Sequence, residues 1–97
     1  MQRLRNKVYK ILLNDSDFRK LGEKHQLEEI EYQVLLSDML VYCFNSDFNP
    51  FLEEEYLDIS YLRLTYYNKE YLIDLDAIYE VFKEYLEEVE ELNYGME

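Results

Sequence analysis

The side chains that could carry out chemistry are few in this chain. It has one histidine and one cysteine, His25 and Cys43, and neither has further ligands at the spacing of a zinc site. Asp74 and Asp76 could contact a divalent cation, but the rest of a calcium loop is missing, so we expect them to end a strand and cap a helix. The chain also lacks a glycine-rich phosphate loop and a nucleophile elbow. The sequence therefore predicts no enzyme activity, no metal and no cofactor.

The stretch Glu80–Leu92, EVFKEYLEEVEEL, is unusual because it holds six glutamates against one lysine. Four of these glutamates, spaced by four, three and four residues, share one face of a helix: Glu80, Glu84, Glu87 and Glu91. Glu88 and Glu90 flank that face. Like charges at this spacing cost a helix ~0.2–0.5 kcal/mol per pair, and glutamates near its C-terminal end oppose the helix dipole. Local stability does not explain such a face, whereas a positively charged partner would.

The 97-residue chain carries a net charge of −12, and this charge is unevenly distributed. Residues 1–24 hold seven Lys/Arg and three Asp/Glu, a net of +4, whereas residues 25–97 carry a net of −16. Such an excess opposes compaction, and a small domain needs only about 2–8 charges of one sign to stay in solution. A negative surface also argues against direct binding to nucleic acid or to an anionic membrane. The charge favours a basic protein as the partner.

The spacing of the acidic face suggests which basic surface the partner would offer. Successive helical turns repeat every ~5.4 Å, and phosphates along one DNA strand advance ~3.4 Å per nucleotide along the axis and lie farther apart through space. A row of carboxylates on a helix can therefore stand in for a row of phosphates. A protein of this kind would compete for a basic DNA- or RNA-binding cleft. The alternative is an acidic face that is simply solvated.

A second acidic cluster precedes the expected hairpin and consists of Glu53, Glu54, Glu55 and Asp58. If this cluster borders the last helix, the two acidic groups form one partner-binding surface. The alternative is that the three glutamates occupy the first turns of a short helix, where the helix dipole favours them.

Tyrosine is abundant, with eleven copies and no tryptophan. Tyr61 and Tyr67 fall on the same side of the expected hairpin as Arg63, and we expect them to be exposed partner contacts, because tyrosine is a common interface anchor. The alternative is cross-strand aromatic packing, which stabilises small sheets.

Hydrophobic periodicity predicts a single α+β domain over residues 1–97, with N-terminal helices, a small antiparallel hairpin and a C-terminal acidic amphipathic helix. The expected elements are helices over 2–13, 17–24, 26–44 and 50–57, a hairpin over 59–66 and 70–74, and a last helix over 77–92. We expect Ser16 and Asp76 to cap the second and last helices, and Pro50 to begin the short one. The hairpin turn, at Asn68-Lys69, lacks glycine.

Two helices carry the apolar faces that should build the core. In the helix over 26–44 one apolar stripe is marked by Leu27, Ile30, Val34 and Val41. Further apolar residues widen this stripe, so the C-terminal half of the helix is expected to be buried nearly all round. In the last helix the apolar positions step by four and three residues: Ile78, Phe82, Tyr85, Val89 and Leu92. This apolar side is expected to pack on the hairpin, which is marginal alone.

The remaining features indicate a cytoplasmic location, which is the host cytoplasm if a phage encodes the chain. The lone Cys43 cannot form an internal disulfide, and a buried free thiol fits a reducing compartment. No segment has the ~18 consecutive apolar residues of a membrane span. The first residues, MQRLRNKVYKILL, lack the apolar run and cleavage site of a signal peptide.

The segment Glu84–Glu91, EYLEEVEE, resembles a stretch near the C-terminus of the Ocr-type antirestriction proteins of phages, which are small acidic DNA mimics. The resemblance covers eight of 97 residues, and the chain departs from that family in its basic N-terminal segment, its expected hairpin and its ending, LNYGME. In composition the chain is similar to the wider group of small acidic phage proteins that block restriction enzymes, DNA glycosylases or CRISPR nucleases. The resemblance implies an inhibitor that occupies the nucleic-acid site of a host nuclease.

These observations lead to one functional hypothesis and two alternatives. The hypothesis is a non-enzymatic, phosphate-mimicking inhibitor of a basic nucleic-acid-binding protein, with the acidic face carrying most of the contact. The first alternative is an antitoxin or immunity protein that neutralises a basic toxin by the same physics. The second is a self-assembling structural protein, for example a homodimer, in which the basic helix Met1–Lys10 of one copy pairs with the acidic helix of another.

Overall fold

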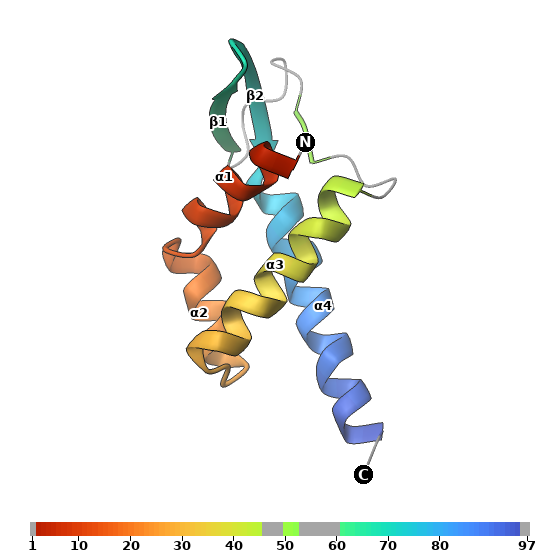
Figure 1. Cartoon of the computed structure of the whole chain (residues 1–97). Coiled ribbons are helices and arrows are strands. Elements are labelled where there is room, and N and C mark those ends of the chain that lie inside the picture. Colours follow the sequence, from red (N-terminus) through yellow and green to blue (C-terminus); the bar gives the residue numbers. More distant parts are fainter. Residues whose placement is uncertain (1, 46–49, 53–60, 96–97) are drawn as a thin grey trace.

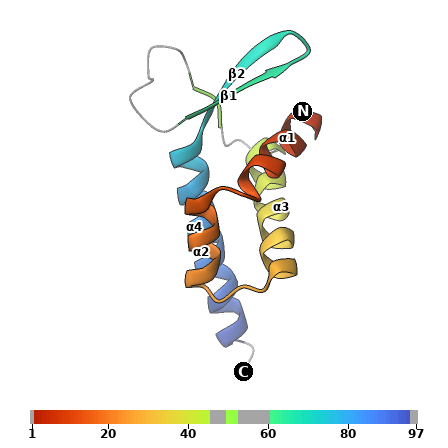
Figure 2. The same ribbon diagram turned by 90° about the vertical axis from the view of Figure 1, so that its left-hand side faces the viewer.

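The structure is a computed structural model that describes residues 2–45, 50–52 and 61–95. Its elements in chain order are α1 (Gln2–Leu12), α2 (Ser16–Lys24), α3 (Glu29–Asn45), β1 (Tyr61–Tyr66), β2 (Lys69–Asp74) and α4 (Leu75–Gly95). This is the α+β fold that the sequence predicts. The hairpin stands at one end of the molecule, and α4 runs from its base to the opposite end (Figure 1). The last turns of α4 extend past α2 and α3 in both views (Figures 1 and 2).

An aromatic cluster joins α2, α3 and α4 at the centre of the core. The fully buried ring of Phe82 stacks on Phe18, with ring centroids 6.0 Å apart, and meets the edge of Tyr32 at 6.0 Å. Phe18 also meets Tyr79 edge to face, at 5.5 Å. Aliphatic side chains from α1, α3, β2 and α4 complete the core, among them Val8, Leu12, Leu36, Leu40, Ile73, Ile78 and Leu86. Burial of these apolar groups is the main favourable contribution to folding.

The N-terminal end of α2 is capped by a different residue from the one expected. The Asp15 carboxylate accepts hydrogen bonds from the backbone N–H groups of Asp17 and Phe18, at 3.0 and 3.1 Å, so Asp15 is the cap and Ser16 is the first helical residue. At the other end Gln26 adopts a left-handed φ of 58°, and the Leu27 N–H bonds the Gly22 carbonyl at 3.0 Å. This turn closes α2, and α3 therefore begins at Glu29 rather than at residue 26.

Gly22 gives a test of how closely α2 and α3 pack. A Cβ at this position would lie 2.7 Å from Cδ1 of Tyr32, whose hydroxyl donates a 2.9 Å hydrogen bond to the Leu12 carbonyl. Glycine-to-alanine changes inside a helix normally stabilise it by ~1 kcal/mol. Because Tyr32 is buried and anchored, we instead expect Gly22→Ala to lower the free energy of unfolding by about 1–3 kcal/mol in urea titrations. The matched change Glu23→Ala, at an exposed site, should be nearly neutral; a more stable Gly22→Ala chain would contradict this packing.

A bidentate ion pair fixes the junction of α2 and α3. Arg19 donates to both carboxylate oxygens of Glu29, at 2.5 and 3.0 Å, and its Nε donates to the Leu13 carbonyl at 2.5 Å. Its guanidinium carbon also lies 4.5 Å from the Tyr32 ring centroid. The bonds from Arg19, followed by one from Gln33, lower the pKa of Glu29 from 4.5 to about 2.

This lowered pKa predicts how the stability of the chain depends on pH. Because the pKa of Glu29 is depressed in the folded state, its stabilising contribution is present above pH 4.5 and is lost as the pH falls towards 2. We therefore expect Glu29→Gln to be less stable than the native chain at neutral pH, and the gap to close within this window. Thermal unfolding at several pH values measures it. The stability gap of Arg19→Met should narrow over the same pH window without closing, because this change also removes the bond to the Leu13 carbonyl and the contact with the Tyr32 ring. A gap independent of pH in both variants would contradict the role of the pair.

The outward face of α3 is more exposed than the sequence predicts. Ile30 and Val34 are 73% and 52% exposed, and Val41 is also exposed, although all three were expected in the buried stripe. The buried residues of α3 lie on its other side: Tyr32, Leu36, Met39, Leu40 and Cys43. The helix is apolar on most sides, so its periodicity did not show which side faces α1 and α4. The expectation of a C-terminal half buried nearly all round was therefore wrong.

The hairpin forms with a two-residue turn at Tyr67-Asn68, one position earlier than expected. Both turn residues have a left-handed φ, 51° and 61°, which matches a type I′ turn and the twist of the strands. Tyr66 pairs with Lys69 and Tyr61 with Asp74, so the register is continuous. The strands span Tyr61–Tyr66 and Lys69–Asp74 rather than 59–66 and 70–74, residues 59–60 being outside the described part. Leu62, Leu64 and Tyr71 pack against the core from this hairpin.

Residues 50–52 are extended where the short helix over 50–57 was expected to begin, and residues 53–57 lie outside the described part. The Leu52 N–H bonds the Leu72 carbonyl and the Pro50 carbonyl accepts from the Asp74 N–H, both at 2.8 Å. Between them Phe51 pairs with Ile73 across the free edge of β2. The Phe51 ring lies 6.0 Å from Phe44 and 5.5 Å from Tyr71, centroid to centroid. Edge pairing and aromatic packing outweigh the local preference for proline at a helix start.

The last helix begins two residues before the expected position, directly after β2. Oδ1 of Asp74 accepts from the Ala77 N–H at 2.9 Å, so Asp74 caps α4 and the expected cap, Asp76, lies within its first turn. The apolar side is confirmed at Ile78 and Phe82, which are buried, and is joined by buried Leu86. Of the expected positions, Tyr85 and Val89 are half-buried, and the side chain of Leu92 lies outside the described part.

Candidate functional site

The glutamates predicted to bind a partner lie together along α4. We call the five side chains Glu80, Glu84, Glu87, Glu88 and Glu91 the acidic face; all five are exposed and lie opposite the buried side of the helix. Within residues 2–45, 50–52 and 61–95, none of these carboxylates forms an ion pair. Lys83, the one basic residue of α4, does not neutralise them. The acidic face therefore presents five charges that the described part of the fold leaves uncompensated.

Glu90, which flanks the acidic face in the sequence, has a different environment. Its Oε1 lies 2.6 Å from Nδ1 of His25, at the C-terminal end of α2. This contact holds the end of α2 against α4. Glu90 is thus engaged in packing between helices, and it was not among the residues predicted to bind a partner.

The basic N-terminal helix does not lie on the acidic face. Nζ of Lys7 donates to the Thr65 carbonyl at 3.0 Å, and the Arg3 guanidinium lies within 3.4 Å of the Tyr67 hydroxyl. Both contacts go to the hairpin, which stands at the opposite end of the molecule from the C-terminal end of α4 (Figure 1). Among the described residues, pairing of the basic segment with the acidic face within one chain is not seen.

The two tyrosines chosen as contacts lie on the hairpin. Tyr67 is 75% exposed at the turn, where its ring packs edge to face on Tyr66 with centroids 4.6 Å apart. Tyr61 is half-buried rather than exposed, and the Arg63 guanidinium carbon lies 6.0 Å from its ring centroid. Arg63 in turn pairs with Glu70 across the strands. The turn and the far end of the acidic face therefore do not form one compact site.

The second acidic cluster precedes β1 in the sequence. Glu53, Glu54, Glu55 and Asp58 lie outside the described residues.

A groove between α3 and α4 was not predicted from the sequence. It has a volume of about 340 Å³ and is lined by Met39, Tyr42, Val81, Glu84, Tyr85 and Glu88. Glu84 and Glu88 thus belong both to the acidic face and to the wall of an apolar hollow. A signal was present in the sequence, because Val81, Glu84, Tyr85 and Glu88 recur at the spacing of one helical face.

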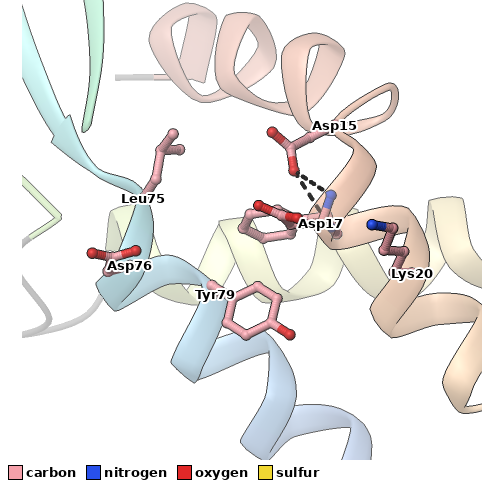
Figure 3. A pocket seen from close by; sticks show the side chains of 7 residues that line it. Asp15, Asp17, Lys20, Leu75, Asp76 and Tyr79 are labelled. Carbon is pink, nitrogen blue, oxygen red and sulfur yellow. Dashed lines mark hydrogen bonds between the residues drawn. The ribbon is translucent and has the colours of Figure 1, made fainter. Parts of the chain in front are cut away.

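A second hollow, of about 290 Å³, lies between α2 and the start of α4 (Figure 3). Three aspartates line it, Asp15, Asp17 and Asp76, together with Lys20 and Tyr79. Asp15 is already used in capping α2, as the dashed lines in Figure 3 show. In the described part of the chain, no group of three or more histidine, cysteine or acidic side chains is placed to hold a metal ion.

The lone cysteine is a core residue. Cys43 is fully buried, its Sγ lies 3.4 Å from the Met39 sulfur, and burial raises the pKa of the thiol to about 12. A thiol with so high a pKa is a poor nucleophile at neutral pH. His25 contacts Glu90, as described above.

Comparisons with protein-family models, with curated proteins and with solved structures found no match to this chain. No helix within the described residues combines the length and the apolar character that crossing a membrane requires.

Proposed function

We propose that this chain is a non-enzymatic inhibitor that binds the basic nucleic-acid-binding surface of another protein and excludes DNA or RNA from it. A host nuclease or other defence protein is the expected class of target, and a phage or mobile element the expected source. The acidic face would occupy the positions of the phosphates. The partner would supply arginine and lysine side chains that normally bind the nucleic-acid backbone.

The observation that carries this proposal is the uncompensated charge of the acidic face. Five exposed carboxylates follow one side of α4 without an ion pair in the described residues. Ordinary solvated helices interleave charges of both signs. Here the fold keeps like charges side by side, and the basic residues of α1 contact the hairpin instead. A helix with this arrangement can pair with a row of basic side chains on the partner that would otherwise bind a phosphate backbone.

An affinity capture tests the proposal and identifies the target. The native chain and a variant with Glu80, Glu84, Glu87 and Glu91 changed to glutamine are each immobilised and exposed to host lysate. Mass spectrometry then identifies the retained proteins at about 0.15 M salt. We expect the native chain alone to retain a nucleic-acid-binding protein, whose binding to DNA or RNA it blocks in a gel-shift assay. Equal retention by both forms would show that the acidic face is only solvated.

The exposed aliphatic face of α3 favours a second candidate, self-assembly. Ile30, Val34 and Val41 lie on the solvent side of α3, and exposed apolar side chains that gather on one face often mark an interface. A homodimer through α3 would leave the acidic face free. Light scattering after size exclusion distinguishes the two, because Val34→Lys should convert such a dimer to a monomer and should leave a monomeric inhibitor unchanged.

A further inference from the structure

The groove between α3 and α4 combines an apolar base with an acidic edge. Met39, at its base, is almost completely buried, and Val81 and Tyr85 are half-buried, whereas Glu84 and Glu88 are exposed. Tyr42 stands on the α3 side and is 56% exposed, which leaves much of its ring free for a ligand. A volume of about 340 Å³ lies at the lower end of the ~300–1,000 Å³ that ligand sites span. The groove therefore suits one long side chain rather than a large molecule.

Its electrostatics select a cation. Glu84 and Glu88 are four residues apart on α4 and lie on the same side of the helix, so their carboxylates repel one another unless a cation lies between them. A third acidic residue is close, because burial and then the neighbouring charge of Asp38 raise the pKa of Tyr85. Among the described residues no lysine or arginine of the chain pairs with any of these three carboxylates. A cation that offsets this repulsion would therefore come from outside the described residues.

We propose that the groove binds one arginine side chain of the partner. This proposal rests on the proposed function and specifies how the acidic face is anchored. The aliphatic stem would lie on Met39 and Val81, and the guanidinium would pair with Glu84 and Glu88 against the ring of Tyr42. Arginine fits better than lysine because its planar guanidinium can bond two carboxylates and stack on an aromatic ring, whereas lysine is a compact, strongly hydrated charge.

This anchor distinguishes two parts of the acidic face. Glu84 and Glu88 border the groove, where a bound partner would cover them and water and salt would screen their attraction to a guanidinium less than at an open surface. Glu80, Glu87 and Glu91 do not line the groove and would act mainly by long-range attraction. Binding energy would therefore concentrate on one arginine, as in other interfaces where a few anchors dominate.

The groove can be tested without knowing the partner, by titrating the isotope-labelled chain with a triarginine peptide and following its NMR spectrum. Trilysine, which has the same charge, is the matched probe. We expect triarginine to shift the signals of Met39, Tyr42 and Tyr85 in a saturable way. Trilysine should bind at least about threefold more weakly than triarginine. The double variant E84Q/E88Q should weaken triarginine binding by about tenfold, whereas E80Q/E87Q, with the same charge change, should weaken it by about twofold.

Three results would overturn the proposal. Equal losses in the two double variants would show that the peptide binds the acidic face diffusely. Absence of any shift at Tyr42 and Tyr85 would show that the groove is not occupied. Shifts of the same signals on dilution of the free chain would show that a second copy fills it.

The peptide titration and the affinity capture fail independently. If the peptide binds diffusely and a nucleic-acid-binding protein is captured, the arginine site in the groove is ruled out and the proposed function is supported. If the peptide binds specifically in the groove and no such protein is captured, the proposed function is ruled out and the groove is still supported as an arginine site.

Discussion

Changing Glu80, Glu84, Glu87 and Glu91 together to glutamine is expected to abolish partner binding and, at the same time, to make the chain more stable. The four carboxylates are exposed on α4, and none forms an ion pair in the described residues. Their like-charge neighbours at i and i+4 cost ~0.2–0.5 kcal/mol per pair, and the last of them also oppose the helix dipole. The change also brings the net charge from −12 to −8.

The gain in stability should be about 1 kcal/mol, which corresponds to a rise in Tm of roughly 4–8 °C for a domain of this size. The native chain should also gain stability when salt is added, because salt screens its self-repulsion, and the variant should gain less. Calorimetry at low and high salt measures both effects. A control variant with the exposed residues Lys10, Lys20 and Lys24 changed to glutamine makes the net charge more negative and should lose stability.

The two results together separate a binding face from a structural one. If the acidic face helped to hold the fold, its neutralisation would lower both stability and binding. If the face were only solvated, stability would rise and binding would not change. If the face is retained for a partner, the glutamine variant should be more stable and should no longer form the complex. Functional surfaces are often retained although they lower local stability.

The acidic face and the hairpin could be predicted because both depend on local spacing. The glutamates and the apolar residues of α4 both recur with the helical period. Their spacing therefore predicts that the two groups lie on opposite sides of the helix. The strand residues Leu62, Leu64 and Tyr66 alternate with Arg63 and Thr65, and the structure keeps that alternation, with the second group exposed.

The features that could not be predicted depend on distant contacts. The extended backbone at Phe51 requires the free edge of β2 and the rings of Phe44 and Tyr71, which no local pattern reveals. Asp74 rather than Asp76 caps α4, because the helix starts where the register of β2 ends. The groove between α3 and α4 depends on how two helices approach each other, and the apolar character of most of α3 hid which side would meet α4.

The core should depend most strongly on Phe82. Its ring is fully buried and contacts Phe18 of α2 and Tyr32 of α3, so one side chain joins three helices. We expect Phe82→Ala to lower the free energy of unfolding by about 3–5 kcal/mol, from the lost apolar burial and the cavity left behind. A domain has only about 5–15 kcal/mol in total, so this single change should remove a large share of its stability.

Urea titration followed by circular dichroism measures this loss, and thermal unfolding should show a Tm lower by more than about 12 °C. Val34→Ala is the matched control, because Val34 is 52% exposed on α3 and its truncation should change stability by less than about 0.5 kcal/mol. A loss below about 1.5 kcal/mol for Phe82→Ala would mean that the aromatic cluster does not hold α2 and α3 on α4. In that case α4, and the acidic face with it, would not be fixed relative to α2 and α3 by these rings.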